Sequence, residues 1–261
     1  MDLKLKGKTA LVVASSQGLG KAIAAELAKE GANVMLTSRS EEKLKATKEE
    51  IEGTAQGKVA YVAADITKPD EIRRLVQETR DTLGPISVLV NNTGGPPAGT
   101  FETFSDEDWQ SAFELTLLSY VRLIREVLPD LKKQGGRILN NASASVKQPL
   151  DNLILSNVFR MGIAGLSKSL SQELAADNIL VNTIGAGRIS TDRIVSLDQT
   201  RAEKQGISEE EERRASESSI PMQRYGEPEE FAKVAAFLVS GANTYMTGQT
   251  LLVDGGLVKA L

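Results

Sequence analysis

The feature that most constrains the fold is a regular alternation of short apolar runs with amphipathic stretches along the whole chain. Val, Leu and Ile dominate the short runs, and almost every run is followed by a longer stretch with helical spacing. Strands of this kind, each followed by a helix, form a parallel sheet that helices cover on both faces. We therefore predict a doubly wound α/β fold with about seven strands, in one domain that spans residues 1–261.

Seven segments are predicted as strands, in the order Thr9–Ala14, Asn33–Ser38, Lys58–Ala64, Ile86–Asn91, Arg137–Asn141, Leu180–Ile184 and Thr250–Val253. The predicted helices are Leu19–Glu30, Glu41–Glu52, Pro69–Leu83, Asp106–Lys133, Leu153–Ala176 and Glu227–Ser240. A polar segment at about 188–220, with a charged run at Glu209–Arg214, breaks the alternation. We expect a helical insertion there, which is either a solvated surface element or a lid over a site at the carboxyl ends of the strands.

Composition excludes several classes of function. The 261 residues include neither cysteine nor histidine, which excludes disulfides, thiolate catalysis, serine–histidine hydrolysis and most zinc chemistry, and we expect no metal site. The formal net charge of −4 gives no general attraction to nucleic acid or to an anionic membrane. Met1–Gly7 lacks the apolar stretch of a signal peptide, and no apolar run has the length of a membrane span. We expect a soluble cytoplasmic protein that acts on a small molecule.

A glycine-containing turn between the first strand and the first helix predicts a phosphate-binding site. Glycines at a helix N-terminus let a pyrophosphate approach free N–H groups and the positive end of the helix dipole, whereas a Cβ atom would hold the phosphates away. The candidate cofactor-binding residues of this turn are Ala14, Ser16, Gln17, Gly18, Leu19 and Gly20.

The spacing of this turn resembles the T-G-x-x-x-G-x-G turn of the short-chain dehydrogenase/reductase family, and other motifs extend the resemblance over nearly the whole chain. The segment Asn91-Asn92-Thr93-Gly94 is similar to the family's N-N-A-G element, and Asp65-Ile66 to its adenine-contacting pair. The C-terminal segments that match are Tyr245–Gln249, Val253–Gly256 and Ile220–Glu229, the last most closely resembling the β-ketoacyl-carrier-protein reductase branch.

This resemblance implies a Rossmann-type fold, a nicotinamide cofactor and a carbonyl or alcohol substrate. It adds Gly187, Ile189 and Thr191 to the candidate cofactor contacts, in a loop where Ala-Gly replaces the family's P-G element. It also implies a homotetramer or homodimer formed through the helices around 102–133 and 153–176.

The end of the second strand bears on the choice of cofactor. NAD-binding proteins place an acidic side chain here to accept hydrogen bonds from the ribose hydroxyls, but this chain has Ser38 followed by Arg39. A guanidinium group without a competing carboxylate binds a 2′-phosphate well, which favours NADP(H) over NAD(H). The alternative is that Arg39 stacks on adenine without selecting the phosphate.

The catalytic positions of the family are an Asn, a Ser and a Tyr-x-x-x-Lys pair, because carbonyl reduction needs a proton donor beside the oxygen that receives charge. Ser143 stands at the place of the family's serine, at the end of the fifth strand. Counted back from Gly165–Leu170, the tyrosine and lysine places hold Ser156 and Arg160, and the asparagine place holds Thr116. The resemblance also gives Arg160 a contact with the nicotinamide ribose.

These replacements change the chemistry that the site can perform. Serine is a weaker acid than tyrosine and arginine does not release a proton at working pH, so Ser156 and Arg160 suit the binding of an oxyanion or a carboxylate better than proton delivery. Lys147, four residues after Ser143, is a candidate for the missing acid if it points inward; otherwise it is a solvated loop lysine. Arg188 is a further candidate anion contact, or it faces solvent.

Three functions are consistent with these residues. The first is an NADP(H)-dependent oxidoreductase that acts on a carbonyl or alcohol, 3-oxoacyl-like by resemblance, with an altered acid/base set. The second is a dinucleotide-binding regulatory or scaffold protein that has lost catalysis. The third is a lyase or isomerase in which Ser143 and Arg160 bind an oxyanion. The retained nucleotide motifs favour the first.

Overall fold

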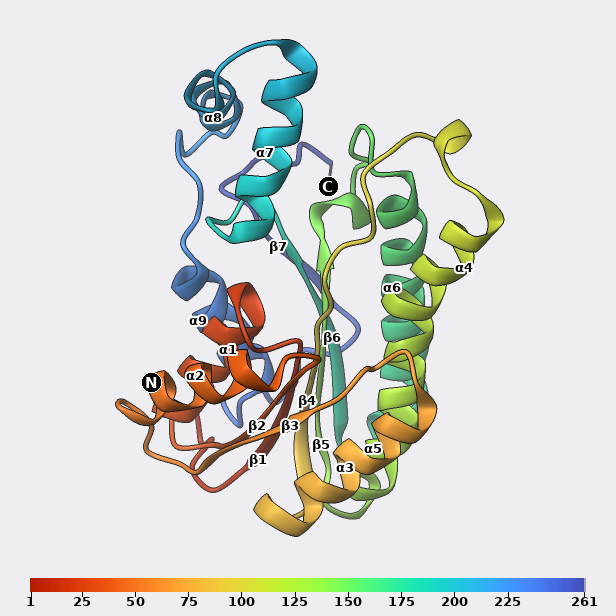
Figure 1. The fold of residues 1–261 in the computed structure, drawn as a ribbon. Helices are drawn as coiled ribbons and strands as arrows, with labels where there is room; N and C mark the ends of the chain where they lie inside the picture. The colour runs from red at the N-terminus through yellow and green to blue at the C-terminus, as the bar shows by residue number, and fades with distance from the viewer. Residues whose placement is uncertain (261) are drawn as a thin grey trace.

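The computed structural model describes residues 1–260 and contains one sheet of seven parallel strands (Figure 1). Its strand order is β3-β2-β1-β4-β5-β6-β7, so the order reverses between β1 and β4. The strands are β1 (Thr9–Val13), β2 (Asn33–Ser38), β3 (Val59–Ala63), β4 (Ile86–Asn91), β5 (Gly136–Ser143), β6 (Ile179–Ala186) and β7 (Thr250–Val253). The doubly wound, Rossmann-type prediction is confirmed, and the reversal marks where a ligand crevice is expected.

Helices cover both faces of this sheet (Figure 1). One face is packed by α1 (Gly18–Lys29), α2 (Glu41–Glu52) and α9 (Pro228–Val239), and the other by α3 (Pro69–Leu83), α5 (Ser119–Gln134) and α6 (Ile154–Glu173). Each helix buries an apolar stripe; α3, for example, buries Ile72, Leu75 and Val76 at helical spacing. The strands between the two layers are therefore apolar on both faces, and every residue of β1 and β4 is buried.

The long helix predicted at Asp106–Lys133 is interrupted. It consists of α4 (Asp106–Phe113), one π-helical turn at Glu114–Leu118, and α5. A π turn inserts an extra residue into the helical ladder and frequently occurs at functional sites. Thr116 lies in the middle of this turn, and sequence periodicity gives no signal of it.

The segment predicted as a helical insertion contains α7 (Asp192–Gln205) and α8 (Glu209–Ser218). Both helices project beyond the carboxyl ends of the strands (Figure 1). Residues of α7 line the crevice there. Within residues 1–260, no helix is long and apolar enough to cross a membrane.

Candidate functional site

The carboxyl ends of the strands open onto a cleft of about 990 Å³. Its walls come from the segments that follow β1 to β6, from α6 and from α7. Nearly all of the candidate residues from the sequence analysis lie in this cleft. Those that line the cleft are Ala14, Ser16, Gln17, Gly18, Leu19, Ser38, Arg39, Asp65, Ile66, Asn92, Thr93, Gly94, Ser143, Ser156, Arg160, Gly187, Ile189 and Thr191.

Three predicted residues do not line the cleft. Gly20 packs behind the phosphate turn: a Cβ atom there would lie 2.3 Å from the carbonyl oxygen of Ala14. Thr116 is fully buried, and its hydroxyl has no hydrogen-bond partner within residues 1–260. Lys147 is exposed, because the 3₁₀ turn after β5 directs it to solvent. The inward orientation that a proton donor needs is therefore not found for Lys147.

The glycine turn after β1 presents the N-terminus of α1 to the cleft. Gly18 has φ of +55°, a left-handed conformation that glycine adopts without strain, whereas Ala14 adopts φ of +48° despite its Cβ atom. No side chain caps this N-terminus, and its first turn has no acidic residue. The unpaired N–H groups and the positive end of the helix dipole are therefore available to an anion.

The end of the cleft near β2 carries two positive side chains. Arg39 follows β2, and Lys43, in the first turn of α2, donates from Nζ to Oε1 of Gln17 at 3.0 Å. Lys43 was not among the candidates from the sequence. Its position four residues after Arg39, at the start of a predicted helix, could have indicated that it lies near Arg39. Together these side chains form a cationic corner beside the phosphate turn.

A pair of acidic and apolar residues follows β3 in the same half of the cleft. Oδ1 of Asp65 accepts hydrogen bonds from the backbone N–H and hydroxyl of Thr67 at 3.0 and 2.7 Å. Burial works to raise the pKa of Asp65, but these hydrogen bonds and nearby positive charges outweigh it, so the pKa is lowered. The carboxylate is thus ionised and fixed, with Ile66 beside it.

Buried asparagines tie the ends of three strands together beneath the cleft. Nδ2 of Asn92 donates to the carbonyl oxygen of Ala14 at 3.2 Å, and Nδ2 of Asn141 donates to Oδ1 of Asn92 at 2.7 Å. A second pair joins Asn91 to Asn140 at 2.8 Å. Because these bonds link β1, β4 and β5, they fix the floor on which a ligand would rest.

Arg160 of α6 lies at the floor of the other half of the cleft and is only 5% exposed. Its Nη1 donates to the carbonyl oxygen of Asn141 at 2.8 Å and to the hydroxyl of Tyr120 at 3.3 Å, and its Nη2 donates to Oγ1 of Thr93 at 3.4 Å. Its Nε is buried without a partner in residues 1–260. Tyr120, one helical turn after Thr116, is a contact that the sequence did not suggest; their i, i+4 spacing was the available signal.

Two serine hydroxyls face this half of the cleft. Ser143 Oγ accepts a hydrogen bond from the backbone N–H of Ser145 at 3.2 Å, so its own proton remains free to donate to a ligand. Ser156 lies in the first turn of α6, one turn before Arg160, and is largely buried. The arrangement offers hydrogen-bond donors to a carbonyl oxygen, but no phenol or imidazole lines this cleft.

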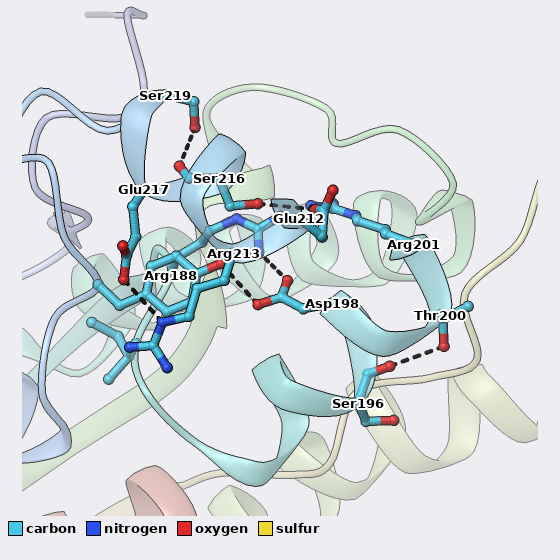
Figure 2. A network of polar contacts seen from close by, with 12 residues as sticks. Arg188, Ser196, Asp198, Thr200, Arg201, Glu212, Arg213, Ser216, Glu217 and Ser219 are labelled. Atoms are coloured by element: carbon cyan, nitrogen blue, oxygen red, sulfur yellow. Dashed lines mark hydrogen bonds and ion pairs between the residues drawn. The ribbon is translucent and has the colours of Figure 1, made fainter. Parts of the chain in front are cut away.

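We call α7 and α8 the lid helices, because they project beyond the strand ends and α7 lines the cleft; a polar network connects them (Figure 2). Arg188, after β6, donates to Oδ1 of Asp198 on α7, while the hydroxyl of Tyr225 donates to Oδ2 of Asp198 at 2.8 Å. Glu212 of α8 accepts from Ser216 at 3.0 Å and pairs with Arg201 of α7 at 3.7 Å. The network therefore connects the loop after β6 to both lid helices.

Arg193 of α7 also lines the cleft, and the sequence candidates did not include it. Its Nη2 donates to the carbonyl oxygen of Pro96 at 2.9 Å, across the cleft mouth. Its proximity to Arg188 and Thr191 in the chain was a signal, but the direction of its side chain depends on the lid geometry. Arg188 does line the cleft as proposed, although Asp198 neutralises its charge.

Comparison with known proteins gives consistent matches over the whole chain. A family model described as Enoyl-(Acyl carrier protein) reductase matches residues 13–258. The chain is 34% identical to a 3-oxoacyl-[acyl-carrier-protein] reductase of Vibrio cholerae, with 98% of this chain and 99% of the relative covered. It is 32% identical to an NADPH-dependent reductase of Bacillus subtilis, covering 97% and 99%. Among solved structures, L-sorbose reductase from Gluconobacter frateurii, complexed with NADPH and L-sorbose, is 33% identical with a TM-score of 0.95 and full coverage of both chains.

Proposed function

Since this chain belongs to the short-chain dehydrogenase/reductase family of NAD(P)-dependent oxidoreductases, we propose that it is an NADP(H)-dependent oxidoreductase that interconverts a carbonyl and an alcohol. One observation carries this proposal: a single cleft contains an uncapped helix N-terminus at one end and two serine hydroxyls with a buried guanidinium at the other. A dinucleotide bound between them would present its nicotinamide to the serines.

The residues of the first half fit a dinucleotide phosphate. The α1 N-terminus suits the pyrophosphate, and the ionised Asp65 with Ile66 suits adenine. The guanidinium of Arg39 and the ammonium of Lys43 suit a 2′-phosphate, in a corner where Ser38 replaces a repelling carboxylate. These features, with relatives described as NADPH-dependent, support NADP(H) over NAD(H).

The second half supplies binding and orientation for the reaction. The cofactor, when bound, supplies or accepts the hydride at the carbonyl carbon. Ser143 and Ser156 donate hydrogen bonds to the carbonyl oxygen and stabilise the negative charge that develops there. Arg160 would hold the cofactor's ribose, and its guanidinium would add a positive charge to the surroundings of the carbonyl oxygen. Because no phenol, imidazole or ammonium group lines this half in the described residues, we infer that the proton comes from a water molecule held by the serines.

The proposed substrate is a 3-oxoacyl-like carbonyl compound. The support comes from the relatives described as 3-oxoacyl-[acyl-carrier-protein] reductases. Leu150 and Leu153 provide an apolar wall next to Ser156, which suits the carbon chain of such a compound.

The first experiment is a fluorescence titration with NADPH and NADH, followed by absorbance assays with a panel of ketones and 3-oxoesters. We expect NADPH to bind at least about tenfold more tightly than NADH, and Arg39→Ala with Lys43→Ala to remove that preference. Arg73→Ala with Lys29→Ala, at two exposed positions that do not line the cleft, is the matched control. Binding without oxidation of NADPH by any carbonyl compound would contradict an oxidoreductase function.

A second candidate is a dinucleotide-binding regulatory or scaffold protein without catalysis. It is favoured by the specific loss of the family's Asn, Tyr and Lys at Thr116, Ser156 and Arg160. Combined Ser156→Tyr and Arg160→Lys would then create turnover in a protein that has none. Ser156→Phe with Arg160→Lys, which adds the ring without the phenol, is the control. Faster turnover by the unaltered protein contradicts this second candidate.

We also propose that the chain assembles as a homotetramer or homodimer through the helices around 102–133 and 153–176. Val158 and Met161 on α6 are 45% and 52% exposed, and Gly162 packs closely against Leu117 beside them. Apolar side chains on an uncovered helix face are consistent with a buried interface in an oligomer. Sedimentation of Met161→Glu should show smaller species than the unaltered protein. The cytoplasmic location expected from the sequence stays a prediction.

A further inference from the structure

We propose that the substrate carries a carboxylate, which Arg193 binds at the mouth of the cleft. This inference rests on the proposed function, because it names the class of carbonyl compound that the substrate half accepts: a short oxo acid.

The first observation is the position of Arg193. Its guanidinium reaches from α7 to Pro96 in the loop after β4 and lies flat against Gly95, where a Cβ atom would come within 3.1 Å of Nη2. A guanidinium has five N–H donors in a fixed fork. Only the hydrogen bond to Pro96 is found within residues 1–260, so donors remain for a ligand. The absence of a side chain at residue 95 makes room for this arrangement.

The second observation is an excess of positive charge in this half. Arg160 and Arg193 both line the cleft, and neither lies within 4.0 Å of a carboxylate in the described part of the chain. Arg193 is an exposed residue that is only partly buried in the cleft. This partial burial lowers the pKa of Arg193, and the charge of Arg160 lowers it further, so each positive charge is unfavourable to the other. Arg188 contrasts with both, because Asp198 neutralises it. An anion bound to Arg193 would offset this repulsion.

One carboxylate, Asp192, also lines this part of the cleft. It is exposed in the first turn of α7, where it stabilises the positive end of the helix dipole. It forms no hydrogen bond with Arg160 or Arg193 in the described residues, so it does not replace a bound anion.

The third observation is the lining between the charged and polar groups. Leu115, Leu153 and Leu197 line the same half of the cleft. These side chains suit a short aliphatic skeleton, while Ser143 and Ser156 suit a carbonyl oxygen and Arg193 suits a carboxylate. The reaction balances for such a compound: NADPH would give a hydride to the carbonyl carbon, and a bound water would give a proton to the oxygen. The hydroxide left by that water takes a proton from bulk solvent, so the oxo acid, NADPH and one solvent proton become the hydroxy acid and NADP⁺ with the carboxylate unchanged.

The cofactor's pyrophosphate is the other possible source of an anion near Arg193, since Thr191 lies beside Gly18. The α1 N-terminus already provides for that pyrophosphate, whereas Arg193 contacts the opposite wall at Pro96. This contact favours a carboxylate of the substrate over a phosphate of the cofactor.

The test compares acetoacetate with methyl acetoacetate, which differ in charge but share the ketone. We expect the unaltered protein to prefer the acid, and Arg193→Leu to lower the acid-to-ester ratio of kcat/KM at least about tenfold. Arg193→Lys should restore part of that ratio, because it keeps the charge and loses the fork. Arg214→Leu, which removes an exposed arginine paired with Glu210 on α8, is the matched control.

Binding experiments distinguish a failure of this inference from a failure of the proposed function. NADPH is titrated first, and acetoacetate or methyl acetoacetate is then titrated by calorimetry into the NADP⁺ complex, which has no hydride to transfer to the ketone. Tighter binding of the acid, lost in Arg193→Leu while the Kd for NADPH changes less than about threefold, supports the inference. An equal affinity for acid and ester, or a parallel loss of NADPH affinity, overturns it and leaves the proposed function standing. If the unaltered protein does not bind NADPH, the proposed function itself fails.

Discussion

The two halves of the cleft present different chemical groups to a ligand. In the half beside β1, β2 and β3, the ligand would meet mainly backbone N–H groups, a glycine turn and one fixed carboxylate. In the half beside β5, β6 and α7, it would meet serine hydroxyls and arginine side chains that reach in from α6 and the lid. The first half would bind the pyrophosphate and adenine that these dinucleotides share, with Arg39 and Lys43 beside a 2′-phosphate, whereas the second half would determine which carbonyl compound is reduced. The chain keeps the family's features in the first half and departs from them in the second.

This difference has a physical basis. A backbone turn tolerates few substitutions, because each Cβ atom added to it displaces either the phosphate or a neighbouring strand. A side-chain site can change when one long residue replaces another, provided that buried charges acquire partners. Arg160 illustrates this freedom, since Tyr120, Thr93 and Asn141 all accept hydrogen bonds from it.

The largest expected effect comes from a substitution at Gly20, in the first half of the cleft. Gly20→Ala would place Cβ 2.3 Å from the carbonyl oxygen of Ala14 and 2.7 Å from Nδ2 of Asn92, so β1 and α1 must separate. We expect the free energy of unfolding to fall by about 3 kcal/mol, together with a loss of NADPH binding. Urea denaturation measures the first quantity and fluorescence titration the second.

Gly165 provides the control for this change. It lies in α6, and a Cβ atom there would meet no other atom within 4 Å. Gly165→Ala should therefore leave the protein as stable as before or stabilise it by up to about 1 kcal/mol through helix propensity. If Gly20→Ala behaves in the same way as Gly165→Ala, the close packing of the first half does not constrain the chain.

The sequence predicts the first half of the cleft better than the second for the same physical reason. Glycine spacing and the end of a predicted strand are local signals that indicated Gly18 and Arg39, and the family resemblance added Asp65; all three line the cleft. The orientation of a long side chain depends on tertiary contacts, which is why Arg193 was missed and Lys147, which is exposed, was considered. The π turn at Thr116 has no periodic signal, because one extra residue in a helix leaves its apolar pattern nearly unchanged.

The second-largest expected effect comes from a substitution in the lid helices, which belong to the second half of the cleft. Asp198→Asn removes the charge that neutralises Arg188 and weakens the acceptor for Tyr225. We expect a loss of about 2 kcal/mol in unfolding free energy, since the largely buried charge of Arg188 then has only neutral acceptors, the amide oxygen at residue 198 and the Tyr225 hydroxyl. Proteolysis should increase within α7 and α8. Asp192→Asn on the same helix is exposed and should change stability by no more than about 0.5 kcal/mol; equal losses in both variants would show that the network does not hold the lid.

A smaller effect concerns the floor beneath the second half. Tyr120→Phe removes a hydroxyl that donates to Asn141 and accepts from Arg160, and we expect a loss of about 1 kcal/mol at neutral pH. Burial raises the pKa of Tyr120, only partly offset by the charge of Arg160. The unfolded chain therefore loses this proton first, near pH 10, and the contribution of Tyr120 to stability is lost as the pH rises further.

The difference between the two proteins should consequently depend on pH. Below pH 10 the unaltered protein keeps its full advantage, and above it the curves of unfolding free energy against pH converge as the buried phenol becomes costly. Denaturation at pH 7 to 11 measures this directly. Tyr245→Phe, at a residue that is 98% exposed, should show no such convergence. A constant difference between the Tyr120→Phe and unaltered proteins across this range would mean that the phenol does not titrate differently on unfolding.

The smallest expected effect comes from Ala14, in the turn after β1 in the first half of the cleft. Ala14 has φ of +48°, in the position where the family's turn has its first glycine, so its Cβ atom is strained by about 1 kcal/mol. Ala14→Gly removes the strain but increases the freedom of the unfolded chain, and we expect a net gain of about 0.5 kcal/mol. Ala25→Gly in α1, where φ is helical, should instead lose about 1 kcal/mol. A gain in unfolding free energy for Ala14→Gly with a loss for Ala25→Gly would show that the backbone of residue 14 is strained by its Cβ atom. A loss in both variants would mean that the turn at Ala14 is unstrained, so that alanine in place of glycine has no energetic cost there.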